Sequence, residues 1–188
     1  MRLPPLLPAE LTAEQQLLYQ DMRSGIASGF KAFKVVRADG ALMGPWNPYL
    51  HEPTVGKAAW DLTRAVDQIA VLPRNVREIA ILVVSARHHC AFQQYAHAAV
   101  AAVLGIALEQ VTTIAAQLRP ITLSADQGLA YDIAHCLCAG AVLPETLYQL
   151  ALARFGQRGT NELIYLIGSY SMVAITLNAF DVPVPEGE

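Results

Sequence analysis

Apolar residues recur at helical spacing along most of this chain. Between Thr54 and Ala70 they are spaced around Trp60 and Leu62, and most later segments show the same period of about 3.6 residues. No run of alternating apolar and polar residues is long enough to indicate an extended strand. The pattern therefore predicts an all-α fold of about seven to eight helices.

Capping residues and helix breakers indicate where these helices begin and end. Thr12 with Gln15, and Ser124 with Gln127, form capping-box patterns that predict helices over about 12–27 and 124–139. Further boundaries are predicted at Pro73, the His88-His89 pair, Cys90, Gly105, Gly140 and Gly156, with Thr160 as the cap of a long final helix.

The segment before the first long apolar helix has a different character. Phe30 to Val36 can pair as a short hairpin around Asp39-Gly40, and prolines and glycines follow as far as Pro53. We expect residues 1–53 to form an N-terminal helix and an irregular arm, and residues 54–180 to form a helical core. Together, 188 residues that are 54% hydrophobic fit one domain spanning 1–188.

Charge and cysteine content narrow the class of protein. The net charge is −3, and the 13 Lys and Arg residues are scattered, which argues against a surface that binds nucleic acid. Three cysteines do not make a disulfide framework, and no targeting segment is recognised at the start. The expected location is the reducing cytoplasm.

An uncharged stretch near the end raises the question of a membrane span. Residues 163–180 carry no charge, but no cluster of Lys or Arg flanks them. Ser, Tyr, Thr and Asn also interrupt the stretch. We therefore interpret it as a central buried helix and expect no membrane contact.

A second apolar stretch contains side chains capable of chemistry. Residues 77–105 are rich in Ala, Val and Ile, yet they include Glu78, Cys90, Gln93 and His97. Cys90 and His97 are seven residues apart and so fall on one face of a helix, with Gln93 between them. This face is the candidate site.

The same residues resemble a known family. The spacing Glu78, Cys90, Gln93 and His97 in an apolar helical context is similar to that of the carboxymuconolactone decarboxylase and alkylhydroperoxidase D-like proteins. The resemblance extends over about residues 20–185 and includes the segments 44–51, 155–163, 177–180 and 182–183. It implies an alkylhydroperoxidase D-like helical domain of the longer type, assembled as a trimer or hexamer, with a dimer left open.

The resemblance implies acid-base chemistry on a small molecule. In a decarboxylase-like reaction on a small lactone or oxygenated carboxylic acid, His97 would transfer the proton and Glu78 would orient its ring. Gln93 would donate a hydrogen bond to a carboxylate or enolate oxygen, and Gln94 and Trp46 would line the pocket. No metal or organic cofactor is required. Many long relatives carry an acidic residue in place of Gln93 and Trp in place of Gln94.

A thiol peroxidase is the first alternative. Cys90 at a helix N-terminus is expected to have a lowered thiol pKa, because the helix dipole favours the thiolate. However, alkylhydroperoxidases of this family carry Cys-x-x-Cys, and Gln93 stands at the place of the second cysteine. Cys136 or Cys138 would have to act as the resolving thiol, within about 7 Å of Cys90 between Cα atoms.

Structural explanations of the same residues also stay open. Glu78 would then be a buried partner of Arg64, Arg77 or Arg87, and the chain would be a catalytically degenerate binding or assembly module. If the protein is a module, Glu78 and His97 should lie apart or be sealed from solvent, whereas an enzyme predicts that they meet at an accessible pocket.

The histidines near Cys90 lack a recognised zinc-ligand spacing, so no metal is expected. An Ala-rich face over 96–102 favours association between copies of the chain.

Overall fold

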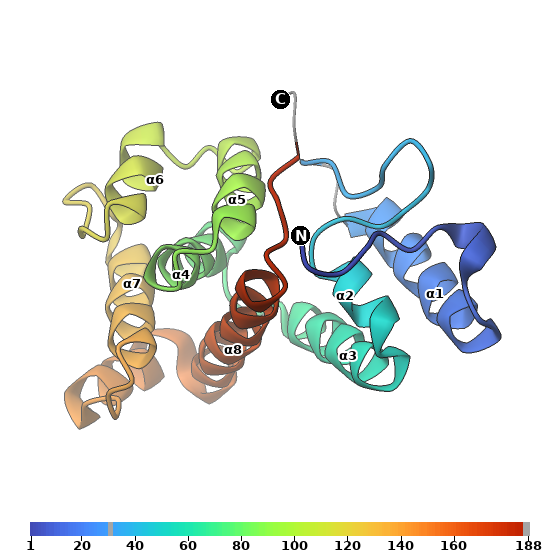
Figure 1. Cartoon of the computed structure of the whole chain (residues 1–188). Coiled ribbons are helices and arrows are strands. Elements are labelled where there is room, and N and C mark those ends of the chain that lie inside the picture. Colours follow the sequence, from blue (N-terminus) through green and yellow to red (C-terminus); the bar gives the residue numbers. More distant parts are fainter. Residues whose placement is uncertain (30–31, 186–188) are drawn as a thin grey trace.

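The computed structural model describes residues 1–29 and 32–185, and helices joined by turns make up this part of the chain (Figure 1). It contains eight α-helices, a single 3₁₀ turn and one isolated bridge between Val36 and Leu42. The all-α prediction is confirmed. The elements are η1 (Pro8–Glu10), α1 (Ala13–Gly29), α2 (Trp46–His51), α3 (Pro53–Ile69), α4 (Arg74–Arg87), α5 (Ala91–Val103), α6 (Leu108–Ala115), α7 (Ala125–Cys138) and α8 (Glu145–Ala179).

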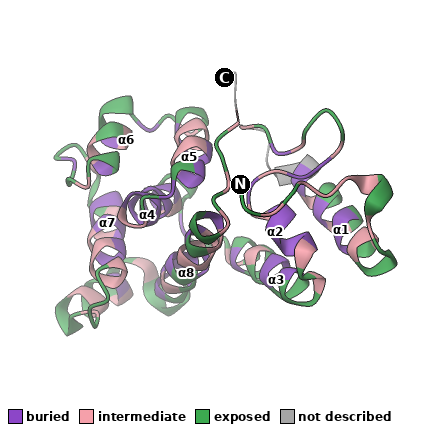
Figure 2. Cartoon of the chain, in the orientation of Figure 1, coloured by how far each residue is buried: buried purple, intermediate pink, exposed green. Residues whose placement is uncertain are grey.

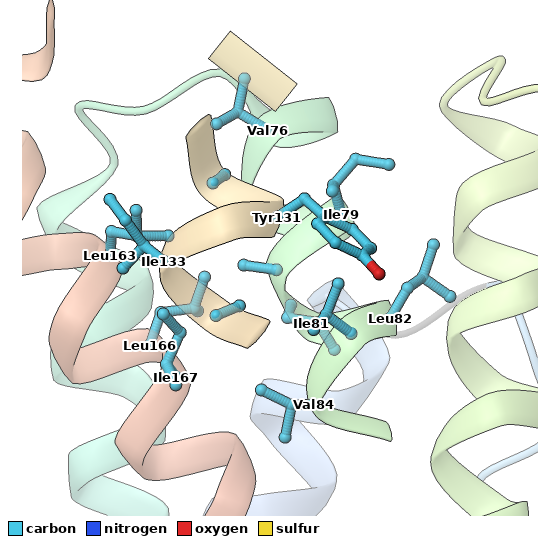
Figure 3. Close-up of a cluster of buried hydrophobic side chains, with 14 of the residues drawn as sticks. Val76, Ile79, Ile81, Leu82, Val84, Tyr131, Ile133, Leu163, Leu166 and Ile167 are labelled. Carbon is cyan, nitrogen blue, oxygen red and sulfur yellow. The ribbon is translucent and has the colours of Figure 1, made fainter. Parts of the chain in front are cut away.

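Helix α4 is the central element of the larger helical group. Every residue from Ile79 to Ala86 is buried, and α4 contacts α5, α6, α7 and α8. Its sequence is apolar on all sides, which is typical of a helix surrounded by others. Figure 3 shows its side chains packed between Tyr131 and Ile133 of α7 and Leu163 and Leu166 of α8. This packing fixes the helix that carries Glu78.

Helices α1, α2 and α3 form a second group beside the first (Figure 1). Their buried side chains, which include Met22, Trp46, Leu50 and Trp60, make a separate hydrophobic cluster. Helix α3 contacts α8, and this contact joins the two groups. The burial colours of Figure 2 show buried faces in both groups. The candidate site lies where the two groups meet.

The N-terminal segment is tied to the rest of the chain by hydrogen bonds. The backbone amide of Arg2 donates to the carbonyl oxygen of Phe180 at 2.8 Å. Asn47 on α2 accepts from the amide of Leu6 at 3.0 Å and donates to the carbonyl of Pro4 at 3.1 Å. The first six residues are therefore held against both α2 and the end of α8.

The arm is more ordered than the sequence predicts, because it contains the short helix α2. Pro45 precedes this helix, and Trp46, Tyr49 and Leu50 are buried in it. A helix of six residues is too short to persist alone, so tertiary packing holds it. The predicted hairpin is limited to the bridge between Val36 and Leu42; residues 30–31, which the prediction included, lie outside the described residues.

Most predicted helix boundaries are confirmed. The capping boxes are present, with reciprocal bonds of 2.9 and 3.3 Å between Thr12 and Gln15 and of 3.0 and 3.3 Å between Ser124 and Gln127. His89 adopts a left-handed conformation with φ 51°, which ends α4 before Cys90 opens α5. This turn brings α5 back against α4.

Helix α8 is interrupted once. Gly156 has φ 66° and ψ 176°, a conformation that is essentially restricted to glycine, so the predicted break there is confirmed. Thr160 is not the cap that we predicted, because its hydroxyl donates to the carbonyl of Gly156 at 2.8 Å from within the next turn. Within the described residues, α8 is long and apolar enough to cross a membrane, judged by length and composition alone. In the 18-residue window that meets this test, 44% is buried inside the protein.

Candidate active site

Glu78 and His97 form a buried pair between α4 and α5. Nδ1 of His97 lies 2.7 Å from Oε1 of Glu78, so the predicted contact is present. A carboxylate only accepts hydrogen bonds, and Nδ1 must therefore be the donor. In the neutral ring this leaves Nε2 with a lone pair, and Nε2 has no hydrogen-bond partner among the described residues. The His97 side chain keeps 11% of its surface accessible and Glu78 keeps 5%.

A large cavity opens beside this pair. It has a volume of about 610 Å³, and its wall comes from α1, α3, α4, α5 and α8, with Glu78, His97 and Tyr170 among the lining residues. The predicted pair therefore lies at an accessible cavity and is neither separated nor sealed.

Three arginines line the large cavity, and they differ in their partners. Arg64 pairs with Asp21 and Asp61, and Arg77 pairs with Asp67 and Glu162. Arg74 is exposed at the start of α4 and forms no ion pair with any described residue. Arg74 is thus the cavity arginine whose charge no described carboxylate balances.

A small pocket of about 50 Å³ adjoins the large cavity. The two share lining residues, including Thr63, His97 and Ser169, so His97 stands where they meet. The rest of the pocket is mainly apolar and comes from the arm, α2, α5 and α8. These further lining residues are Pro45, Trp46, Tyr49, Phe92, Gln93, Ala96, Val173 and Leu177.

Gln93 lines the small pocket, and only the nitrogen of its side-chain amide has a hydrogen-bond partner in the described part of the chain. Its Nε2 donates to the backbone carbonyl of Tyr170 at 3.0 Å, and its Oε1 is buried without a hydrogen-bond partner among the described residues. One of its two amide protons is therefore used within the protein, which leaves one for the predicted hydrogen bond to a substrate oxygen.

Two tyrosines that the sequence analysis did not select also line the site. Burial raises the pKa of Tyr49 to about 12, and its hydroxyl is buried without a partner in the described part of the chain. Burial also raises the pKa of Tyr170, and the nearby Glu78 carboxylate adds to this effect. The Tyr170 ring contacts the His97 ring edge to face, with centroids 5.2 Å apart. Both hydroxyls therefore stay protonated near neutral pH.

Cys90 and Gln94 lie outside both cavities. The Cys90 residue is only 1% exposed, and burial raises its thiol pKa more than the backbone amides of Gln93 and Phe92 lower it. The predicted lowering by the helix dipole is therefore wrong in direction, because desolvation is the larger effect. Nε2 of Gln94 donates to the carbonyl of Ser85 at 3.4 Å, away from the cavities.

Signals for some of the missed residues were present in the sequence. Tyr49 belongs to the segment 44–51 that carries part of the family resemblance. Trp46 of the same segment was the residue predicted to line the pocket. Tyr170 and Ser169 are among the polar interruptions of the final apolar helix. Across residues 1–29 and 32–185, no group of three or more His, Cys, Asp and Glu side chains is arranged to hold a metal ion.

Neither a protein-family model nor a curated protein matches this chain. Solved structures do. An uncharacterised peroxidase-related protein from Ralstonia eutropha JMP134 with an alkylhydroperoxidase AhpD core has a TM-score of 0.77 at 15% identity, over 98% of this chain and 92% of the other. The debrominase Bmp8, in complex with 2,3,4-tribromopyrrole, has a TM-score of 0.70 at 12% identity, over 97% and 90%.

A protein of unknown function from Agrobacterium tumefaciens gives a further match. Its TM-score is 0.68 at 15% identity, over 75% of this chain and 97% of the other. At these identities the likeness establishes the fold alone. The chain therefore has the AhpD-like all-α fold.

Proposed function

We propose that this protein is an enzyme that uses His97 as an acid-base group on a small oxygenated carboxylic acid or lactone. The reaction is a decarboxylation or a related lyase or isomerase step. The observation that carries the proposal is the Glu78–His97 pair, which lies in the wall of a large cavity and leaves Nε2 without a described partner. Glu78 acts by holding the ring in one tautomer.

Arg74 supports a carboxylate as part of the substrate. It lines the large cavity and has no described counter-charge, whereas Arg64 and Arg77 are paired. A guanidinium offers a planar set of donors that matches a carboxylate. The debrominase neighbour is described with a halogenated pyrrole, so a small ring has a precedent in this fold.

The proposed decarboxylation needs only proton transfer from the protein. When carbon dioxide leaves, the electron pair of the broken C–C bond moves into a conjugated carbonyl and gives an enolate. Protonated His97 then delivers the Nε2 proton to carbon, and the ring takes a proton back from solvent before the next turnover. In an isomerase step, neutral His97 would first remove a proton at the same atom.

The thiol peroxidase remains the second candidate, because two fold neighbours carry alkylhydroperoxidase descriptions. The Cys90 thiol is buried, has a raised pKa and lines neither cavity, which argues against peroxide attack there. A binding module without catalysis is the third candidate. The accessible cavity at the Glu78–His97 pair favours the enzyme over a module in which this pair is sealed.

A turnover screen tests the proposal. The protein is incubated with small lactones, keto acids and unsaturated carboxylic acids, and loss of substrate absorbance and release of carbon dioxide are recorded. His97→Asn is expected to lower kcat by about 10²- to 10⁴-fold. His89→Asn is the matched control, since His89 is an exposed turn residue with a positive φ that asparagine tolerates. Equal loss in both variants, or turnover only of hydroperoxides, contradicts the proposal.

We also propose that the protein forms a homo-oligomer through α5 and the start of α6. Ala96 and Ala101 of the Ala-rich face are buried within the chain, but Val103 and Leu108 are 74% and 76% exposed. Large exposed side chains of this kind favour burial against another copy. Light scattering on the native protein and on Val103→Glu tests this proposal, with a smaller assembly expected for the variant.

A further inference from the structure

Several polar side chains that line the small pocket already donate their protons to backbone carbonyls. The Thr63 hydroxyl donates to the carbonyl of Ala59 at 3.0 Å, and the Ser169 hydroxyl donates to that of Leu166 at 2.9 Å. Each hydroxyl has one proton, so both present only lone pairs to the pocket. Gln93 likewise spends an amide proton on a backbone carbonyl. Thr63, Ser169 and Gln93 therefore all keep acceptor lone pairs without a partner of their own in the described structure.

The orientation of the Gln93 amide is fixed by chemistry. A backbone carbonyl oxygen cannot donate, so the nitrogen of Gln93 must face Tyr170, and the oxygen is the end of the amide that is left over. That oxygen is buried and unpartnered among the described residues, and so is the hydroxyl of Tyr49. Leaving a buried polar atom without a partner is unfavourable. Both atoms belong to side chains that line the pocket, so a ligand there can supply the donor for Gln93 and the acceptor for Tyr49.

The lining also determines the charge of that ligand. Among the described residues, no Asp, Glu, Lys or Arg side chain lines the small pocket. An ionised group would lose its hydration in a lining that is otherwise mainly apolar. His97 is the residue of this lining that can carry a positive charge, and its Nδ1 is already paired with the Glu78 carboxylate. The volume of about 50 Å³ suits a group of only a few atoms. A small uncharged group meets these limits.

We propose that the small pocket is a subsite for an uncharged hydroxyl of the substrate, which accepts a hydrogen bond from Tyr49 and donates one to Gln93. This inference rests on the proposed function for the position of the reacting centre at His97. It names a substrate class, a hydroxylated carboxylic acid, whose hydroxyl enters the pocket while its carboxylate stays in the large cavity with Arg74. Tyr49 and Gln93 then set specificity for that hydroxyl.

Binding measurements test this subsite without requiring turnover. Dissociation constants are measured by ligand-observed NMR for benzoate, for the meta and para isomers of hydroxybenzoate, and for the matching dicarboxylates isophthalate and terephthalate. One hydroxybenzoate is expected to bind roughly tenfold more tightly than benzoate, because two buried groups gain partners. The dicarboxylates are expected to bind no better than benzoate.

Two variants test whether Tyr49 and Gln93 cause the preference for the hydroxybenzoate over benzoate. Tyr49→Phe and Gln93→Met should each remove most of the advantage of the hydroxybenzoate, measured as the ratio of the benzoate and hydroxybenzoate dissociation constants within the same variant. Thr54→Val, on the exposed start of α3, is the control and should keep the preference. Circular dichroism establishes that each variant is folded.

Several outcomes overturn the inference. They are equal binding of all the acids, preferred binding of a dicarboxylate, absence of binding by every probe, or a hydroxyl preference that both variants retain. Displacement of a bound hydroxybenzoate by cumene hydroperoxide, with no hydroxyl preference among the acids, would assign the pocket to peroxide instead. Failure of the turnover screen with a preserved hydroxyl preference would reject the proposed reaction but keep the subsite.

Discussion

Arg77 forms its buried ion pair with Glu162 and not with its sequence neighbour Glu78. Nε of Arg77 lies 3.3 Å from Oε1 of Glu162, whose Oε2 accepts from the backbone amides of Val71 and Leu72 at 2.7 and 3.0 Å. The side chain of Glu162 is completely buried. Because α8 supplies this partner for Arg77, Glu78 remains available to His97. The carboxylate that pairs with Arg77 and the carboxylate that contacts His97 are thus different residues.

Removal of the Glu162 carboxylate should destabilise the fold. Glu162→Ala leaves two backbone amides without their acceptor and removes the buried ion-pair partner of Arg77, so we expect a loss of about 3–5 kcal/mol in the free energy of unfolding. Urea denaturation followed by circular dichroism measures it. Glu145→Ala, at the exposed start of α8, serves as the control. A loss below about 1 kcal/mol for Glu162→Ala would contradict this role.

Tyr49 should make stability fall at high pH. Its pKa rises from 10.0 to about 12 on folding, so between these values the unfolded chain has lost the proton that the folded chain retains. Unfolding then releases a proton, and raising the pH favours unfolding, by roughly 3 kcal/mol in total for this group. Below pH 10 the contribution is complete. Tyr49→Phe should show a shallower decline in urea denaturation between pH 10 and 12, and equal slopes for both proteins would contradict the prediction.

The Cys90 thiol should react slowly in the native protein. Burial raises its pKa, whereas Cys136 is partly exposed. With iodoacetamide at neutral pH, we expect modification of Cys90 to be at least about tenfold slower than that of Cys136. Mass spectrometry of the alkylated peptides measures the two rates, and the difference should vanish in urea. Rapid, preferential alkylation of native Cys90 would instead favour the peroxidase.

Gly56 should be required for the position of Tyr49. A Cβ atom at residue 56 would overlap the carbonyl oxygen of Tyr49, because α2 and α3 approach each other closely there. Gly56→Ala should therefore lose about 1–3 kcal/mol of stability. Gly168→Ala is the matched control, since nothing lies within 4 Å of its added methyl. That control should be neutral or stabilising by up to about 1 kcal/mol. A neutral Gly56→Ala would show that the backbone yields easily.

The sequence was sufficient to predict that Glu78 and His97 meet, but not that Cys90 and Gln94 lie outside both cavities. The apolar run of α4, the break at His89 and the spacing from Glu78 to His97 all depend on local signals, and together they place the pair on facing helices. Helix α2 was not predicted, because its six residues are held by packing and not by helix propensity. The orientation of Gln93 depends on a carbonyl 77 residues away. Such long-range hydrogen bonds leave no periodic trace in the sequence.

The origin of the pocket wall has a practical consequence for redesign. Trp46 and Tyr49 belong to α2, whereas Glu78 and His97 belong to α4 and α5. Exchange of residues 42–50 for other sequences would therefore change this part of the pocket wall and leave Glu78 and His97 in place. Gln93 and Ala96, which α5 contributes to the same pocket, would also be kept.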